Sequence, residues 1–192
     1  MQLELKKQKK KTALLQAAYE LFLKKGVPLT SVGDITAKAS VAKGTFYLYF
    51  RDKEDILGAV SAAILRQILE EGYMKMGAGR TGSFTENLIR LADAALDYLQ
   101  QNRGVLEILR RGCRMPKLSR EDPLWRSLMR DLKQSEGQEL AGKSEEEVFR
   151  ILYCLLTMGG SVAAAAILRG EPETMEKMKP ALYGIIRAAL AE

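Results

Sequence analysis

Apolar residues recur at helical spacing along nearly the whole of this chain, and no stretch alternates apolar with polar residues for long. The pattern is clearest between Leu14 and Phe22, where apolar side chains fall three or four residues apart. Such spacing places them on one face of a helix, whereas strict alternation would place them on one face of a strand. The sequence therefore predicts an all-α fold of about nine helices.

Turn and capping residues mark where these helices begin and end. Lys24, Lys25 and Gly26 are typical of a helix end, and Ser31 with Asp34 is typical of a helix start. A second helix is then expected to about Ala39, and Asp52 is a good N-cap for a long later helix. Helices are also expected over 83–101, between 102 and 115, from 123 to 137 or 142, over 144–170 and over 173–191.

Positive charge is concentrated at the N-terminal end. Up to Leu57 there are 11 Lys and Arg against 6 Asp and Glu, a net charge of +5, and the remainder holds 19 against 18, a net charge of +1. This asymmetry predicts contact with a polyanion, either nucleic acid or an anionic membrane surface. The plainer alternative is a solvated lysine run at the start of a helix.

Histidine is absent, and the two cysteines, Cys113 and Cys154, have no CxxC partner. The absence of His removes imidazole-based catalysis and His-containing metal sites. Two isolated thiols predict neither a disulfide framework nor a metal site, and they fit a reducing cytoplasm. We expect a cytoplasmic protein with no cofactor and no metal. An enzyme that uses either cysteine as its nucleophile is the least favoured function class.

Residues 151–168 carry no charge and are long enough to be considered as a membrane span. Much of the segment is Gly, Ala, Ser and Thr, which gain little free energy on transfer into lipid. We therefore interpret it as a helix buried on several sides by protein, either in a core or at a subunit interface.

Two short predicted helices near the N-terminus are joined by the three-residue turn Ser40-Val41-Ala42, and the first helix of the chain precedes them. These are the parts of a helix-turn-helix. The second short helix is predicted over residues 43–50, with Phe46 and Phe50 on its inner face. Its opposite side presents Lys43, Gly44, Thr45, Tyr47, Leu48 and Tyr49.

This outer side suits a DNA groove better than water. Gly44 lets the helix approach the duplex, Thr45 can bond base edges or phosphate, and Leu48 can contact a thymine methyl. Lys43 and the hydroxyls of the two tyrosines are predicted to hold phosphates. Phosphate contacts are also predicted at two other helix starts, by Thr30, Ser31 and Lys53.

Residues 30–53, TSVGDITAKASVAKGTFYLYFRDK, closely resemble the DNA-binding signature of the tetracycline-repressor (TetR) family. The most specific part is KGTFYLYFRDK at 43–53, and the resemblance covers about a quarter of the chain. Two residues depart from the family pattern. Ser40 stands where Gly is usual in the turn, and Ala42 stands where a capping Ser or Thr is usual.

The resemblance implies a helix-turn-helix DNA-binding domain over 1–52 and a helical ligand-binding and dimerisation domain over 53–192. It implies a transcriptional regulator, and not an enzyme, that represses from a palindromic operator. The partners implied are double-stranded operator DNA, a second copy bound through the last two helices, and a small-molecule effector of unknown identity. Candidate effector-lining residues are Tyr98, Leu106, Arg110, Cys113, Trp125, Met129 and Tyr153.

The alternative function is a helical interaction protein that docks on an anionic membrane surface through its Lys-rich start. For each candidate effector-lining residue taken alone, core packing or a solvated surface is the plainer role, because Met and aromatic residues at helical spacing usually form core.

Overall fold

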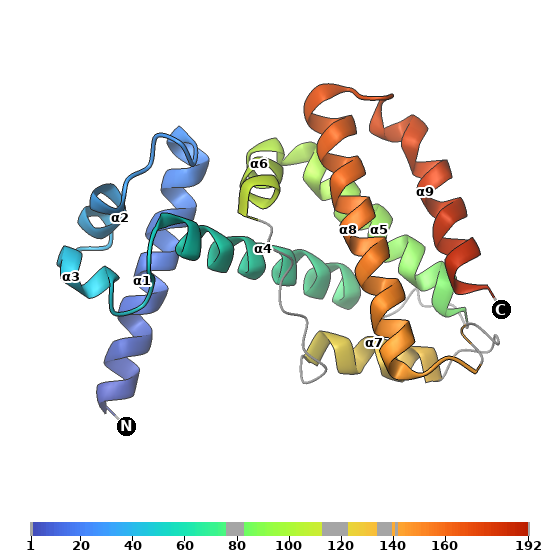
Figure 1. The fold of residues 1–192 in the computed structure, drawn as a ribbon, viewed down its shortest axis with the longest axis horizontal. Helices are drawn as coiled ribbons and strands as arrows, with labels where there is room; N and C mark the ends of the chain where they lie inside the picture. The colour runs from blue at the N-terminus through green and yellow to red at the C-terminus, as the bar shows by residue number, and fades with distance from the viewer. Residues whose placement is uncertain (1, 76–82, 113–122, 134–139, 141, 192) are drawn as a thin grey trace. The chain divides into compact units, whose positions relative to one another are not determined.

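The structure is a computed structural model that describes residues 2–75, 83–112, 123–133, 140 and 142–191. Within these ranges the chain forms nine α-helices and no strand, as predicted (Figure 1). The helices are α1 (Gln2–Lys25), α2 (Val32–Lys38), α3 (Lys43–Phe46), α4 (Lys53–Lys75), α5 (Phe84–Gln101), α6 (Arg103–Gly112), α7 (Pro123–Lys133), α8 (Glu145–Arg169) and α9 (Met175–Leu190).

The helices belong to two compact units. The first unit holds residues 1–65 and 104–116, and the second holds residues 66–103 and 117–192. The first half of α4 and nearly all of α6 therefore pack with the N-terminal helices. The division of the chain at residue 52 into a DNA-binding and a regulatory domain stays a prediction.

Predicted capping residues end and begin several helices. Gly26 follows α1 with φ +81°, and Gly170 follows α8 with φ +72°. Both are left-handed conformations that glycine adopts without a steric penalty. Ser31 and Ser144 form reciprocal capping boxes, in which the serine hydroxyl accepts the third backbone N–H and the carboxylate there accepts the serine N–H.

One predicted helix is too long, and one of the two predicted ends of another helix is wrong. The predicted helix over 43–50 is regular only to Phe46, after which Leu48 N donates to Thr45 O (3.3 Å) and Tyr49 N to Phe46 O (2.9 Å). Such three-residue spacing tightens a helix end into turns. The helix that starts at Pro123 does not reach Gly142, because Leu140 and Gly142 both have positive φ. Its other predicted end, near 137, lies outside the described residues.

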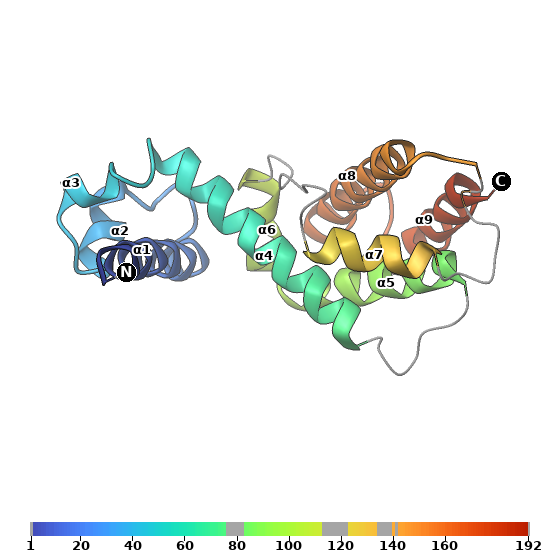
Figure 2. The ribbon, with the colours of Figure 1, turned by 90° about the horizontal axis from the view of Figure 1, so that it is seen from below.

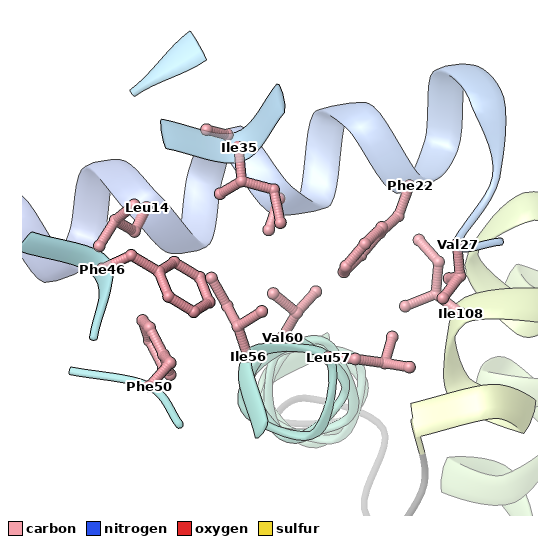
Figure 3. Close-up of a cluster of buried hydrophobic side chains, with 12 residues drawn as sticks. Leu14, Phe22, Val27, Ile35, Phe46, Phe50, Ile56, Leu57, Val60 and Ile108 are labelled. Atoms are coloured by element: carbon pink, nitrogen blue, oxygen red, sulfur yellow. The ribbon is translucent and has the colours of Figure 1, made fainter. Parts of the chain in front are cut away.

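The core of the first unit joins α1, α2 and α3 to the start of α4 and to α6. Leu14 and Phe22 of α1 pack with Phe46, while Ile56 of α4 and Ile108 of α6 complete the cluster (Figure 3). Leu14, Phe46 and Ile56 have no exposed surface. Since burying each such side chain contributes about 1.5–3 kcal/mol, this cluster holds the short α3 in place.

In the second unit, α5, α8 and α9 pack against one another, with α8 and α9 running side by side in both views (Figures 1 and 2). Trp125 and Met129 of α7 are buried in their common core. Polar contacts also join α5 to α9. The Lys179 ammonium pairs with Asp93 (2.6 Å) and Asp97, and the Tyr183 hydroxyl donates to Asp93.

Among the described helices, α8 is the one whose length and apolar composition would allow it to span a membrane. The first alternative for this segment, a helix enclosed in a core, is wrong, because only 22% of its apolar stretch is buried within one chain. The second alternative, a subunit interface, stays a prediction. The exposed side of α8 and the adjoining side of α9 form what we call the α8–α9 face. Its members are Tyr153, Cys154, Thr157, Gly160, Ser161, Ala181, Gly184, Ile185 and Ala188.

Candidate nucleic-acid interface

The segment that begins at Lys43 buries its phenylalanines and turns its other side to solvent. Phe46 is fully buried, Phe50 nearly so, and their rings lie 5.7 Å apart between centroids. Tyr47 is 54% exposed and Leu48 is 78% exposed. The phenylalanines anchor the segment, and a large apolar side chain is left in water beside them.

Two further residues extend this exposed surface. Lys43 and Gly44 are exposed, and a Cβ built on Gly44 would meet no described atom within 4 Å. Lys43, Gly44, Tyr47 and Leu48 together form what we call the recognition face. Thr45 and Tyr49 are half-buried next to it. The open space at Gly44 is what close approach of a duplex requires.

Thr30 and Ser31 are already engaged in local structure. Thr30 is 1% exposed, and its hydroxyl donates to Gly26 O at 2.8 Å. This placement does not favour the predicted phosphate contact through the Thr30 hydroxyl. The exposed Ser31 hydroxyl caps α2 through Asp34, and its predicted phosphate contact stays a prediction.

Lys53, at the first position of α4, makes a contact that the sequence did not indicate. Its ammonium donates to the backbone oxygen of Val27 at 3.1 Å, which ties the start of α4 to the α1–α2 loop. An ammonium has three donors, so this bond leaves Lys53 able to bind a phosphate as well.

Two carboxylates of the first unit are neutralised by lysines. Lys25 lies 2.8 Å from Asp34, and Lys38 lies 2.7 Å from Glu20. Hydrogen bonds from Lys25 and Ser31 hold the pKa of Asp34 well below its usual value, and those from Lys38 and Gln16 lower the pKa of Glu20. Both acids stay ionised and paired, so they add little negative field near the recognition face.

The two departures from the family signature have visible consequences. Ser40 has φ +53°, a left-handed conformation that a residue with a Cβ adopts at a cost of about 1–2 kcal/mol. Ala42 is the N-cap of α3 and makes no side-chain capping bond. A glycine at position 40 would remove the backbone strain. A serine or threonine at position 42 would accept a hydrogen bond from a backbone N–H of α3. These two effects explain the usual pattern.

A close contact between α4 and α6 was not predicted. The Ser61 hydroxyl, buried in α4, donates to Ile108 O at 3.2 Å. A Cβ on Gly112 would collide with the Ser61 hydroxyl and would lie 2.8 Å from Leu57 O. Only glycine lets the two backbones approach this closely. The only signal in the sequence is a glycine at the end of an apolar helix, which also suits an ordinary helix end.

Of the predicted effector-lining residues, Leu106 and Arg110 belong to the first unit, Tyr98, Trp125, Met129 and Tyr153 belong to the second, and their common site stays a prediction. Trp125 and Met129 lie in one apolar cluster, and the Trp125 indole N–H donates to Glu145 at 3.1 Å. Tyr153 is exposed and reaches this cluster through the ring of Phe149. The remaining candidates are a buried Leu106, an exposed Arg110 paired with Glu107 at 2.9 Å, an exposed Tyr98, and Cys113, which lies outside the described residues.

Sequence comparison matches the first unit to known regulators. The family model of bacterial regulatory proteins, tetR family, matches residues 14–60. The uncharacterized HTH-type transcriptional regulator YvdT of Bacillus subtilis is 41% identical over 58 residues, which are 30% of this chain and 30% of that protein. The sequence match therefore spans less than a third of this curated relative.

Structure comparison covers nearly the whole chain. A TetR transcriptional regulator from Rhodococcus sp. RHA1 superposes with a TM-score of 0.72 at 16% identity, over 97% of this chain and 98% of that one. The Bacillus subtilis regulator FadR, solved in complex with stearoyl-CoA, gives a TM-score of 0.54 at 17% identity, over 93% and 98%. At such low identity, these likenesses establish the fold of both units.

Proposed function

Because this chain belongs to the TetR family of bacterial regulatory proteins, we propose that it is a homodimeric repressor that binds a palindromic operator in the cytoplasm. The observation that carries the proposal is the recognition face. Its side chains stand in solvent above two buried phenylalanines, at the end of a helix-turn-helix.

The residues of the recognition face divide into those that contact or approach the bases and those that bind phosphates. Leu48 enters the major groove and contacts a thymine methyl, and Gly44 allows the backbone to approach. The Tyr47 hydroxyl and the Lys43 ammonium bind phosphates and set the register without reading bases. Tyr47 is held for this task by the edge-to-face contact of its ring with Phe46, at 5.4 Å between centroids.

The α8–α9 face supports the proposed dimer. It carries no charged side chain, yet it includes Ile185, which is 46% exposed. A Cβ built on Gly160 or Gly184 would meet no described atom within 4 Å, so neither glycine serves packing in a single chain. The Thr157 hydroxyl donates to Tyr153 O at 2.8 Å, so it can be buried with its hydrogen bond intact. Small residues here let the helices of a second copy approach closely.

A two-fold dimer explains why the operator would be palindromic. Each copy presents the same recognition face, and the two faces meet half-sites about one helical turn, or a multiple of it, apart. Repression follows where such a site overlaps a promoter.

We also propose a small hydrophobic effector that binds in the second unit. FadR of Bacillus subtilis, which shares this fold, has been solved with stearoyl-CoA. In this chain Trp125 and Met129 lie in the apolar core of the second unit, which is where the proposed effector would bind. A thermal-shift screen of hydrophobic compounds tests this proposal, and a raised melting temperature identifies the compounds that bind.

The test of DNA binding begins with fragments of genomic DNA captured by the whole protein. An operator duplex made from the captured consensus is then titrated in gel-shift assays with the wild type and with Tyr47→Phe. The variant lacks only the hydroxyl, so we expect its Kd to rise by at least about tenfold, because one hydrogen bond to a charged phosphate is removed per half-site. Its thermal stability should not change.

Tyr98→Phe is the matched control, since it removes another exposed tyrosine hydroxyl in the second unit. Its operator affinity should equal that of the wild type. Capture of no enriched sequence by the wild type, or an unchanged Kd for Tyr47→Phe, would count against the proposed interface.

A further inference from the structure

The N-terminal part of α1 extends beyond the matched helix-turn-helix and carries a dense positive charge. Leu14 is the first residue of the helix in the buried core, and the family model also begins there. Residues 5–12 are helical and exposed, and Figure 1 shows this end of α1 projecting past α2 and α3. The stretch contains no carboxylate and five lysines: Lys6, Lys7, Lys9, Lys10 and Lys11.

We propose that this lysine arm, residues 6–11, is a second DNA contact, which binds the phosphate backbone next to the half-site read by the recognition face. The proposal rests on the proposed function, because it requires that the protein bind duplex DNA.

The direction of the arm follows from helix geometry. Lys7, Lys10 and Lys11 precede Leu14 by seven, four and three residues, so they lie on the same face of α1 as Leu14. Leu14 packs against Phe46, directly behind the recognition face (Figure 3). The arm therefore begins one helical turn from the point where α1 contacts α3, with lysines on the side that α3 occupies.

The length of the arm matches a short piece of duplex backbone. At about 1.5 Å rise per residue, Lys6 to Lys11 span about 7.5 Å along the helix axis. Phosphates of one strand are about 3.4 Å apart along the duplex axis, so the arm can contact about two of them.

Charge patterning gives independent support. Lys6 and Lys10, and likewise Lys7 and Lys11, are like charges four residues apart, which repel on a helix. Cations near a helix N-terminus also oppose the helix dipole. Both effects disfavour this part of α1 in isolation, and both are relieved when a polyanion neutralises the lysines. We therefore expect amides of residues 5–12 to exchange more slowly in the DNA complex.

The test uses the full chain and the operator duplex captured by the wild type, titrated between about 0.05 and 0.3 M KCl, a range over which phosphate binding weakens measurably. One variant changes all five lysines of the arm to Gln, and a second changes them to Arg. A control, Lys24→Gln with Arg126→Gln and Arg130→Gln, removes three exposed cations elsewhere. Arg is included because it restores the charge, and the arm lies outside the core, so thermal stability should not change.

We expect the Gln variant to bind at least about tenfold more weakly near 0.15 M KCl, and its salt slope to fall by about 0.9 for each phosphate that the arm neutralises. The Arg variant should restore both quantities, and the control should stay near the wild type. If the wild type binds normally and the Gln variant has the same affinity and salt slope, the proposed role of the lysine arm is wrong, while the proposed DNA-binding function stands. An equal reduction per charge in the control also overturns the proposed role of the arm, because it indicates a general effect of net charge.

Flotation with vesicles of phosphatidylserine and phosphatidylcholine tests the alternative that the lysine arm binds an anionic membrane surface. If the wild type floats, the Gln variant does not, and DNA affinity is the same for both, the lysine arm is a membrane contact and our inference is wrong. If the wild type binds no duplex at all, the proposed function fails and the inference fails with it.

Discussion

Two of the surfaces in the described part of the chain that leave apolar side chains in water differ in what surrounds those side chains. On the recognition face, Leu48 stands beside Lys43, Tyr47 and an open glycine. On the α8–α9 face, Ile185 stands among small uncharged residues of two long helices. The first surroundings suit a charged partner with grooves, and the second suit a flat apolar partner such as the same face of another copy.

The difference shows that the neighbours of an exposed apolar residue determine which kind of partner it suits. In the proposed complex, a single leucine among donors contributes selectivity between bases and little burial. A stripe of alanine, glycine and isoleucine contributes burial and no selectivity among polar partners. The two surfaces should therefore respond in opposite ways to substitutions that add charge or remove apolar area.

The largest expected effect is on the α8–α9 face. Ile185→Glu would bring two carboxylates, one from each copy, together across the proposed two-fold interface and leave them without a positive partner. We expect a monomer in sedimentation analysis and an operator affinity lower by about a hundredfold or more, because the two half-sites are no longer bound by one particle. Met74→Glu, at another exposed apolar residue, is the control and should remain dimeric. A dimeric Ile185→Glu variant would indicate a different interface.

A smaller effect is expected at the recognition face. Leu48→Ala keeps the dimer but removes the proposed contact with a thymine methyl. Affinity for the captured operator should fall by about tenfold, and selection from random duplexes should no longer prefer thymine at one position per half-site. A consensus identical to that of the wild type would eliminate the thymine contact and leave Leu48 without a role in base selection.

The smallest effect is expected from Ala42→Ser, which adds the missing cap of α3. A serine hydroxyl at this position can accept a backbone N–H, which should stabilise the first unit by about 1 kcal/mol. Denaturant unfolding measures the gain, and sedimentation should show no change in the dimer. A variant less stable than the wild type would indicate that the hydroxyl cannot reach the first turn of α3.

Much of the first unit could be predicted because its signals are local. Spacing of apolar residues assigned Phe46 and Phe50 to the inside and Leu48 to the outside, and capping residues located the end of α1 and the start of α2. The length of α3 could not be predicted in this way. The helical spacing of apolar residues continues to Phe50, although the backbone after Phe46 forms turns.

Contacts between distant segments could not be predicted. Nothing near Asp93 and Asp97 in the sequence indicates that Lys179 lies between them, and nothing near Val27 indicates Lys53. Burial also depends on partners, so the uncharged stretch 151–168 of α8 was interpreted as enclosed although one side of it is open in a single chain. The effector-lining residues stay predictions because no local pattern distinguishes a packed core from a cavity wall.

The helix α4 belongs to both compact units, since the division falls between Leu65 and Arg66 within its continuous run. Its first half is fixed to α6 by the hydrogen bond from Ser61 to Ile108 O and by the close approach of α4 at Gly112. The first half of α4 therefore turns together with the N-terminal helices and with the turn that carries Leu48, because Ile56 and Phe46 share one buried cluster.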